Sequence, residues 1–274
     1  MASRSYPTHK LGAALLLAAM AGVLLLSARL LGGPIAVMAA AVVLAGGAMF
    51  SPRIRPAMLL RFYRAHELEP SMARGLHEEV AARAARAGLR RPPKLYLVNN
   101  PTLTAFSVGT PKDSAIGISH RLLYRLEPRE LVGIVAHEMS HIVAGDVTLF
   151  SLGEVIARLV RTLAFVGFVL AILFSALGGG PVSLTALLFV SAAPLGISLI
   201  QFALSRNREY DADRAGAALT GDPLGLANAL QRIETDRKSS IERVLSPFGE
   251  QRLPQLLRTH PPTADRIARL LGTA

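Results

Sequence analysis

The chain has 274 residues, of which 51% are hydrophobic, and it carries a net charge of +11 with no cysteine. The lack of cysteine excludes disulfides, thiolate nucleophiles and Cys-ligated zinc. The basic excess contains no basic patch interleaved with aromatic residues, so we expect no nucleic-acid partner.

Two apolar stretches open the chain, at about residues 11–28 and 30–50, with Arg29 between them. A membrane-spanning helix needs about 20 apolar residues. We therefore predict a transmembrane hairpin over 11–50. The alternative is a cleaved signal peptide with Arg4 and Lys10 in its charged region, but the apolar core is long for one and a second apolar run follows it.

The polar region 51–161 follows, and we expect it to form the larger part of a catalytic domain. Residues 71–89 have the pattern of an amphipathic helix. Ser71 is placed to cap its N-terminus, and Gly88 lies where a C-terminal glycine belongs.

Three short strands are predicted after this helix. Prolines followed by the alternating "KLYLV" predict a strand within 91–101, and residues 104–110 and 114–119 predict a hairpin joined by "PKD". A helix should then begin near Pro128, a good first-turn residue, and end near Gly145.

No charged residue occurs from 162 to 205, and the glycine-rich "LGGGP" at 177–181 supplies a turn. This pattern predicts a second transmembrane hairpin over 162–205, in preference to a buried pair of core helices. The region 206–274 is helical in pattern and should complete the catalytic domain. Its helices are expected over 205–221, over 222–233 with Asp222 as cap and Pro223 first, and over 260–271.

Arginines follow the second and the fourth predicted spans, and positive residues of short loops stay on the cytoplasmic side. The sequence therefore predicts a multi-pass protein of the cell inner (plasma) membrane, with both termini and the catalytic domain cytoplasmic. The expected fold is mainly α, with four transmembrane helices in two hairpins plus a cytoplasmic α+β domain that contains a small β-sheet. We interpret these arginines as topology signals that contact lipid headgroups: Arg53, Arg55, Arg61, Arg64, Arg206 and Arg208.

The stretch "GIVAHEMSHIVAGD" at 133–146 contains the pattern His-Glu-x-x-His. Residues four apart lie on one face of a helix, so His137 and His141 can direct both imidazoles at one ion. Glu138 lies beside that face, where it can reach a water at the metal and act as the general base. Zinc bound there would lower the pKa of that water to about 7 and polarise a substrate carbonyl.

A catalytic zinc has three protein ligands and one open position. The extended pattern with a third histidine fails, because Ala144 and Val147 occupy the required positions. An acidic third ligand is expected, and its candidates are Asp146, Glu154 and Glu209. We favour Glu209, because the second hairpin can return it to the zinc helix. Asp213, four residues later on the same helical face, can accept a hydrogen bond from a ligating imidazole. The alternative for this stretch is a solvated, salt-bridging face formed by Arg206, Arg208, Glu209 and Asp213.

"HEMSH", the hydrophobic hairpin, "SRNREYDAD" and "THPPTADRI" together resemble the HtpX-type membrane zinc endopeptidases, relatives of the CAAX prenyl endopeptidases. The resemblance extends from about residue 50 to residue 270. It implies a zincin-like catalytic domain of the gluzincin type, HExxH plus Glu, with one zinc ion per chain. By resemblance, His137, His141 and Glu209 bind zinc, Glu138 is the base and Asp213 supports the site. His260 matches a histidine near the catalytic water or oxyanion, and Arg266 makes a structural contact.

The resemblance also implies that the strand before the zinc helix, here Thr104, Ala105 and Phe106, borders the cleft and pairs with an extended substrate. The family usually has Asn-Ala-Phe there, and Thr104 lacks the amide donor of that Asn, so the resemblance implies backbone pairing for this strand and no side-chain contact by Thr104. The alternative is an ordinary sheet strand with Phe106 in the core. The implied substrates are proteins or peptides, in particular misfolded membrane proteins cut in cytoplasmic loops. The other readings are an intramembrane protease, which the charged residues before the motif oppose, and a non-catalytic zinc-binding membrane scaffold or chaperone.

Overall fold

The computed structural model describes residues 6–50, 60, 64–100, 102–177, 183–245 and 261–272. The chain divides into two compact units. One consists of Met1–Arg53 and Leu149–Ser205, and the other of Ile54–Thr148 and Arg206–Ala274. The first unit is made of apolar helices, and the second contains a small mixed sheet and every described residue of the candidate site.

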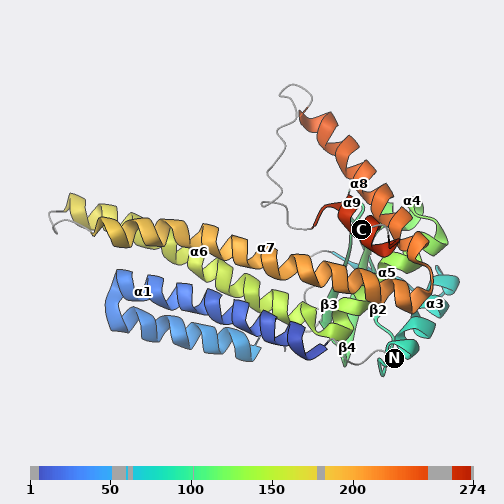
Figure 1. Cartoon of the computed structure of the whole chain (residues 1–274), viewed down its shortest axis with the longest axis horizontal. Coiled ribbons are helices and arrows are strands. Elements are labelled where there is room, and N and C mark those ends of the chain that lie inside the picture. The colour runs from blue at the N-terminus through green and yellow to red at the C-terminus, as the bar shows by residue number, and fades with distance from the viewer. Residues whose placement is uncertain are drawn as a thin grey trace. The chain divides into compact units, whose positions relative to one another are not determined.

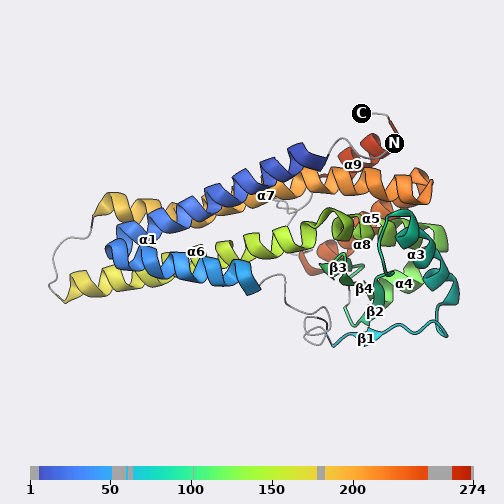
Figure 2. The same cartoon turned by 90° about the horizontal axis from the view of Figure 1, so that it is seen from below.

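The helical unit is built from α1 (Tyr6–Phe50) and from the apolar parts of α6 (Asp146–Ala176) and α7 (Leu184–Thr220). Figures 1 and 2 show the ribbon of α1 reversing its direction along its length. Gly33 has a left-handed φ of 64° and Pro34 follows it. A glycine in the left-handed region followed by a proline interrupts a regular helix, so the chain reverses at Gly33 and Pro34. This is four residues after Arg29, which separates the two predicted apolar stretches.

The core of the helical unit joins all three helices, through Met20 and Leu24 of α1, Ile156 of α6 and Ile197 of α7. Its outside is apolar as well: Leu15, Ile35, Met38, Phe165 and Leu188 are each more than 60% exposed. Among the described residues α7 is the one helix both long and apolar enough to cross a membrane, and Ala14–Leu30 and Gly33–Gly46 are shorter apolar stretches.

The second unit contains a four-stranded sheet in the order β1-β2-β4-β3. The strands are β1 (His66–Glu67), β2 (Lys94–Val98), β3 (Ala105–Thr110) and β4 (Asp113–Ser119). β2 and β4 are parallel, whereas β1–β2 and β3–β4 are antiparallel. The predicted hairpin is confirmed, with Thr110 opposite Asp113. β1 was not predicted, because two residues are too few to show an alternating pattern.

The helices of this unit follow the predicted pattern with shifted ends. α3 (Arg74–Arg86) starts later than predicted and has no side-chain cap; the Ser71 hydroxyl instead contacts Glu69, so the predicted Ser71 cap is wrong. α4 (His120–Arg125) was not predicted. α5 (Pro128–Ala144) has proline at its start and ends at Gly145, whose φ is 78°.

The C-terminal region is helical, as expected. The helix predicted over 205–221 is the end of α7, which continues without a break from the apolar segment. α8 (Pro223–Leu245) begins with the predicted cap, since the Gly225 amide donates to Asp222 Oδ1 at 2.9 Å, and it is longer than predicted. α9 (Thr263–Leu270) completes the unit. One core joins α3, α5 and α8 to the sheet, with Met139 and Ile142 of α5 fully buried in it.

Candidate metal centre

The two histidines lie on α5, a helix that is capped at its N-terminus and buried along one side. The Glu127 side chain and Glu130 form a capping box at its N-terminus, and Arg232 of α8 donates to Glu130 at 2.9 Å. Apolar residues on either side of the motif bury the helix in the core of the unit. As a result His137 and His141 are only 6% and 7% exposed, and they lie on the same face of α5.

α7 brings the acidic residues against this face. Glu209, Asp213 and Gly216 recur at the spacing of one helical face, and Glu209 and Asp213 are buried. Gly216 lies so close to α5 that a Cβ at this position would be 2.9 Å from the His137 nitrogen and 3.0 Å from its Cα. The close approach of the two helices at Gly216 therefore places the carboxylates of α7 beside the imidazoles.

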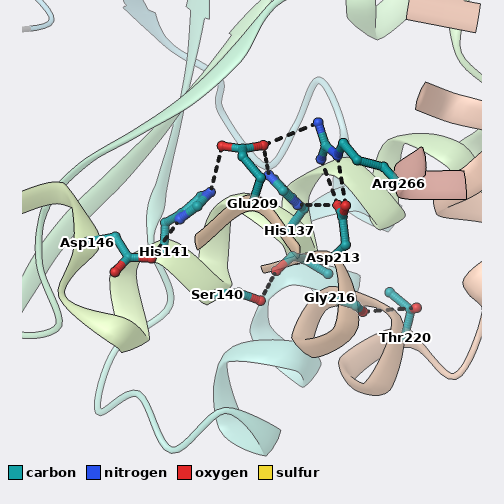
Figure 3. A network of polar contacts seen from close by, with 10 residues as sticks. His137, Ser140, His141, Asp146, Glu209, Asp213, Gly216, Thr220 and Arg266 are labelled. Carbon is teal, nitrogen blue, oxygen red and sulfur yellow. Dashed lines mark hydrogen bonds and ion pairs between the residues drawn. The ribbon is translucent and has the colours of Figure 1, made fainter. Parts of the chain in front are cut away.

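The two imidazoles and Glu209 converge on one point (Figure 3). His137 Nε2 is 3.7 Å from Glu209 Oε2, and His141 Nε2 is 3.8 Å from Glu209 Oε1. The three donor atoms lie within 4.8 Å of one another. These distances are too long for hydrogen bonds, whereas ligands of a tetrahedral zinc with bonds of about 2.0–2.2 Å lie about 3.3–3.6 Å apart. The donor set and its spacing therefore fit a zinc ion.

The outer nitrogen of His137 faces a carboxylate. His137 Nδ1 lies 3.0 Å from Asp213 Oδ1; the N–H is not well aligned, but the short distance between two buried groups makes them partners. Arg266 donates to both oxygens of Asp213, at 2.6 and 2.7 Å, and lies 3.2 Å from Glu209. Arg266 thus neutralises charge on both carboxylates of α7, which is the structural contact expected of it.

The outer nitrogen of His141 contacts Asp146, at 2.9 Å between Nδ1 and Oδ2. Burial would lower the pKa of His141, but the hydrogen bond with Asp146 and the charges of nearby carboxylates outweigh it, so the pKa is raised. Glu138 is among those carboxylates. Glu138 follows His137 on α5, and its side chain is partly buried.

Two other candidate ligands lie elsewhere. Asp146 contacts the far side of the His141 ring and does not belong to the group of three donors. Glu154 is exposed in the helical unit and pairs with Arg161 at 2.8 Å. The alternative of a solvated face on α7 is wrong, because Arg208, Glu209 and Asp213 are all buried.

The strand expected to bind substrate lies beside the zinc helix. α5 packs against β3, which is at the end of the described sheet. Thr104 precedes β3; its amide donates to Ser119 Oγ at 3.1 Å and its hydroxyl lies 2.7 Å from that of Thr102. Ala105 pairs with Ile118, and the Phe106 ring covers Gly117. His260 lies outside the described residues.

Neither the contact of Asp146 with His141 nor the burial of Arg208 was predicted from the sequence. The Arg208 guanidinium lies 2.5 Å from Asp146, and both side chains are less than 10% exposed. The interpretation of Arg208 as a lipid-headgroup contact is therefore wrong. The sequence did contain a signal for this contact. Asp146 comes five residues after His141 and directly follows Gly145, the glycine that ends the helix, so Asp146 lies at the turn where the chain reverses towards the histidine.

The chain is similar to known peptidases over most of its length. The model of Peptidase family M48 matches residues 70–274. A protease HtpX homologue of Desulfatibacillum aliphaticivorans is 33% identical over 279 residues, covering 96% of this chain and 89% of the relative. A second, of Kineococcus radiotolerans, is 36% identical over 239 residues and covers 79% of each chain.

Among solved structures, that of S. mikatae Ste24p is similar, with a TM-score of 0.52 and 20% identity. The alignment covers 94% of this chain and 63% of that chain, so the present chain is the shorter of the two. This likeness concerns the fold alone. With the family match over most of the chain and the identity to the HtpX homologues, the chain belongs to peptidase family M48.

Proposed function

We propose that this protein is a zinc-dependent endopeptidase that binds one zinc ion through His137, His141 and Glu209. The observation that carries the proposal is the convergence of these three buried side chains, whose outer partners leave both Nε2 atoms directed at the Glu209 carboxylate. A catalytic zinc site has three protein ligands and one open position, whereas a structural zinc site usually has four protein ligands. The three donors found here correspond to the catalytic kind.

Glu138 is the proposed base. Its position next to His137 and its partly exposed side chain would allow it to take a proton from the attacking water and pass it to the leaving amine. When bound, zinc would polarise the scissile carbonyl and acidify that water. Asp213 and Arg266 hold His137 and Glu209 in place. His260 is proposed, on the resemblance alone, to lie near the water or the oxyanion.

The substrate is proposed to bind along β3 as an extended peptide. β3 ends the described sheet and packs against α5, so a peptide pairing there would run past the histidines. Ala105 and Phe106 would contribute through backbone pairing. The hydroxyl of Thr104 is engaged with Thr102, so a side-chain contact with substrate would have to replace that interaction.

We further propose that the helical unit crosses a membrane four times, as two hairpins. The large exposed apolar side chains on α1, α6 and α7 support this, because a bundle in water would not leave so many uncovered. The arginines after the second and fourth spans support a multi-pass protein with a cytoplasmic catalytic unit. The proposed role is quality control of misfolded membrane proteins, cut at the cytoplasmic surface.

The test compares wild type with Glu138→Gln, both purified in detergent with a chelator and then supplied with zinc. Cleavage of an unfolded protein should require zinc and fall by several orders of magnitude in Glu138→Gln, while zinc content stays at one per chain. Glu78→Gln, a change at an exposed position of α3, is the matched control and should keep wild-type cleavage. Equal cleavage by wild type and Glu138→Gln would refute the base assignment, and zinc binding without any cleavage would favour a scaffold.

A further inference from the structure

The zinc helix ends in a turn that brings a carboxylate back to its own histidine. α5 ends at Ala144, Gly145 adopts a left-handed φ of 78°, and α6 begins at Asp146. This reversal places Asp146 Oδ2 2.9 Å from His141 Nδ1. An imidazole that donates its Nδ1 hydrogen to a carboxylate keeps Nε2 free as a ligand, so the contact selects the tautomer that metal binding requires.

Asp146 is in turn held by Arg208 of α7. The guanidinium Nη2 lies 2.5 Å from Asp146 Oδ1, and the two side chains are 8% and 3% exposed. Arg208 immediately precedes Glu209 in the sequence. α7 therefore supplies the candidate ligand Glu209 and, from the adjacent residue Arg208, the cation that neutralises Asp146, the partner of His141.

The arrangement repeats the one on the other histidine. His137 faces Asp213, which is paired with Arg266, and His141 faces Asp146, which is paired with Arg208. Figure 3 shows the two aspartates on the outer sides of the two rings, with Glu209 between the inner nitrogens. Each imidazole thus faces a buried carboxylate, and each carboxylate is ion-paired with a buried arginine.

We propose that Asp146 and Arg208 are positioning residues for the metal centre. Asp146 orients His141, and Arg208 holds Asp146 while fixing the helix that presents Glu209. This inference rests on the proposed zinc site. Loss of such outer partners lowers metal affinity by about 10- to 100-fold, which sets the effect to be measured.

The experiment measures zinc affinity of the full chain in detergent by competition with a chromophoric chelator, together with the visible spectrum of the cobalt-loaded protein. Asp146→Asn and Arg208→Met should each weaken zinc binding about 10- to 100-fold and alter the cobalt spectrum. Arg208→Lys, which keeps the charge, should recover part of the affinity. The exposed ion pair of Arg214 and Asp211 on the same helix provides the control, and Arg214→Met should bind zinc within threefold of wild type.

A double variant separates positioning from simple folding. Asp146→Leu with Arg208→Met removes both buried charges, so neither is left unpaired and the chain should regain thermal stability. Positioning predicts that zinc affinity stays low in this variant, whereas a purely structural role predicts that affinity recovers with stability. If zinc affinity recovered in the double variant, or if the single variants bound zinc within threefold of wild type, the positioning role would be refuted while the proposed function would stand. A wild-type chain that binds no zinc would overturn the proposed function and this inference with it.

Discussion

Gly216→Ala should damage the metal centre although it replaces a poor helix former with the best one. The new Cβ would lie 2.9 Å from the His137 nitrogen and 3.0 Å from its Cα, about half an ångström inside the 3.4 Å at which ordinary contact begins. The atoms it meets are backbone atoms of a buried helix, so α7 must move away from α5. Overpacking of this kind costs about 1–3 kcal/mol, against a gain of about 1 kcal/mol in helix propensity.

The net expectation is a loss of up to about 2 kcal/mol, together with weaker zinc binding because Glu209 and Asp213 move with α7. Unfolding by urea in detergent, followed by a chelator competition, measures both quantities. Gly75→Ala on α3 is the matched control: nothing lies within 4 Å of its Cβ, so it should be neutral or stabilising. If Gly216→Ala proved as stable as Gly75→Ala with unchanged zinc affinity, the close approach of α7 to α5 would not be what positions the carboxylates.

Three further substitutions test local features of the same unit. Asp222 accepts from the Gly225 amide and from Arg129, and these interactions hold its pKa below the ordinary value. A carboxyl group whose pKa is lower in the folded state stabilises the fold above its unfolded pKa, and this contribution is lost as the pH falls through the folded pKa. Asp222→Ala should therefore lower the free energy of unfolding by about 1 kcal/mol at pH 7 and by less in acid. A difference in unfolding free energy, measured by urea denaturation, that does not change with pH would contradict this. Gly145→Ala and Gly88→Ala both force an L-residue to φ above 70° without a steric clash, at about 1–2 kcal/mol each. Only Gly145→Ala should also lower zinc affinity, because Asp146 follows it, and equal zinc affinities in the two variants would show that the turn does not matter to the site.

Local chemistry explains which elements could be predicted from the sequence. Pro128 and Gly145 bracket the zinc helix because one has a fixed φ and the other adopts a left-handed φ without steric cost. Asp222 and Pro223 start α8 for the same local reason. The two candidate histidine ligands could also be predicted from the local sequence, because the helical repeat places His137 and His141, four residues apart, on one face.

The sequence could not show what depends on contacts between distant segments. Arg208 resembled a surface arginine after a membrane span, and only folding revealed that it is buried against Asp146. Gly216 had no local signal, because its role is the space it leaves for the backbone of His137. The short-range pattern of the sequence thus determined the helices and the histidine pair, through backbone geometry that each segment carries alone. The tertiary structure decided which carboxylates reach those histidines and which arginines hold the carboxylates, because these depend on how closely α7 packs on α5.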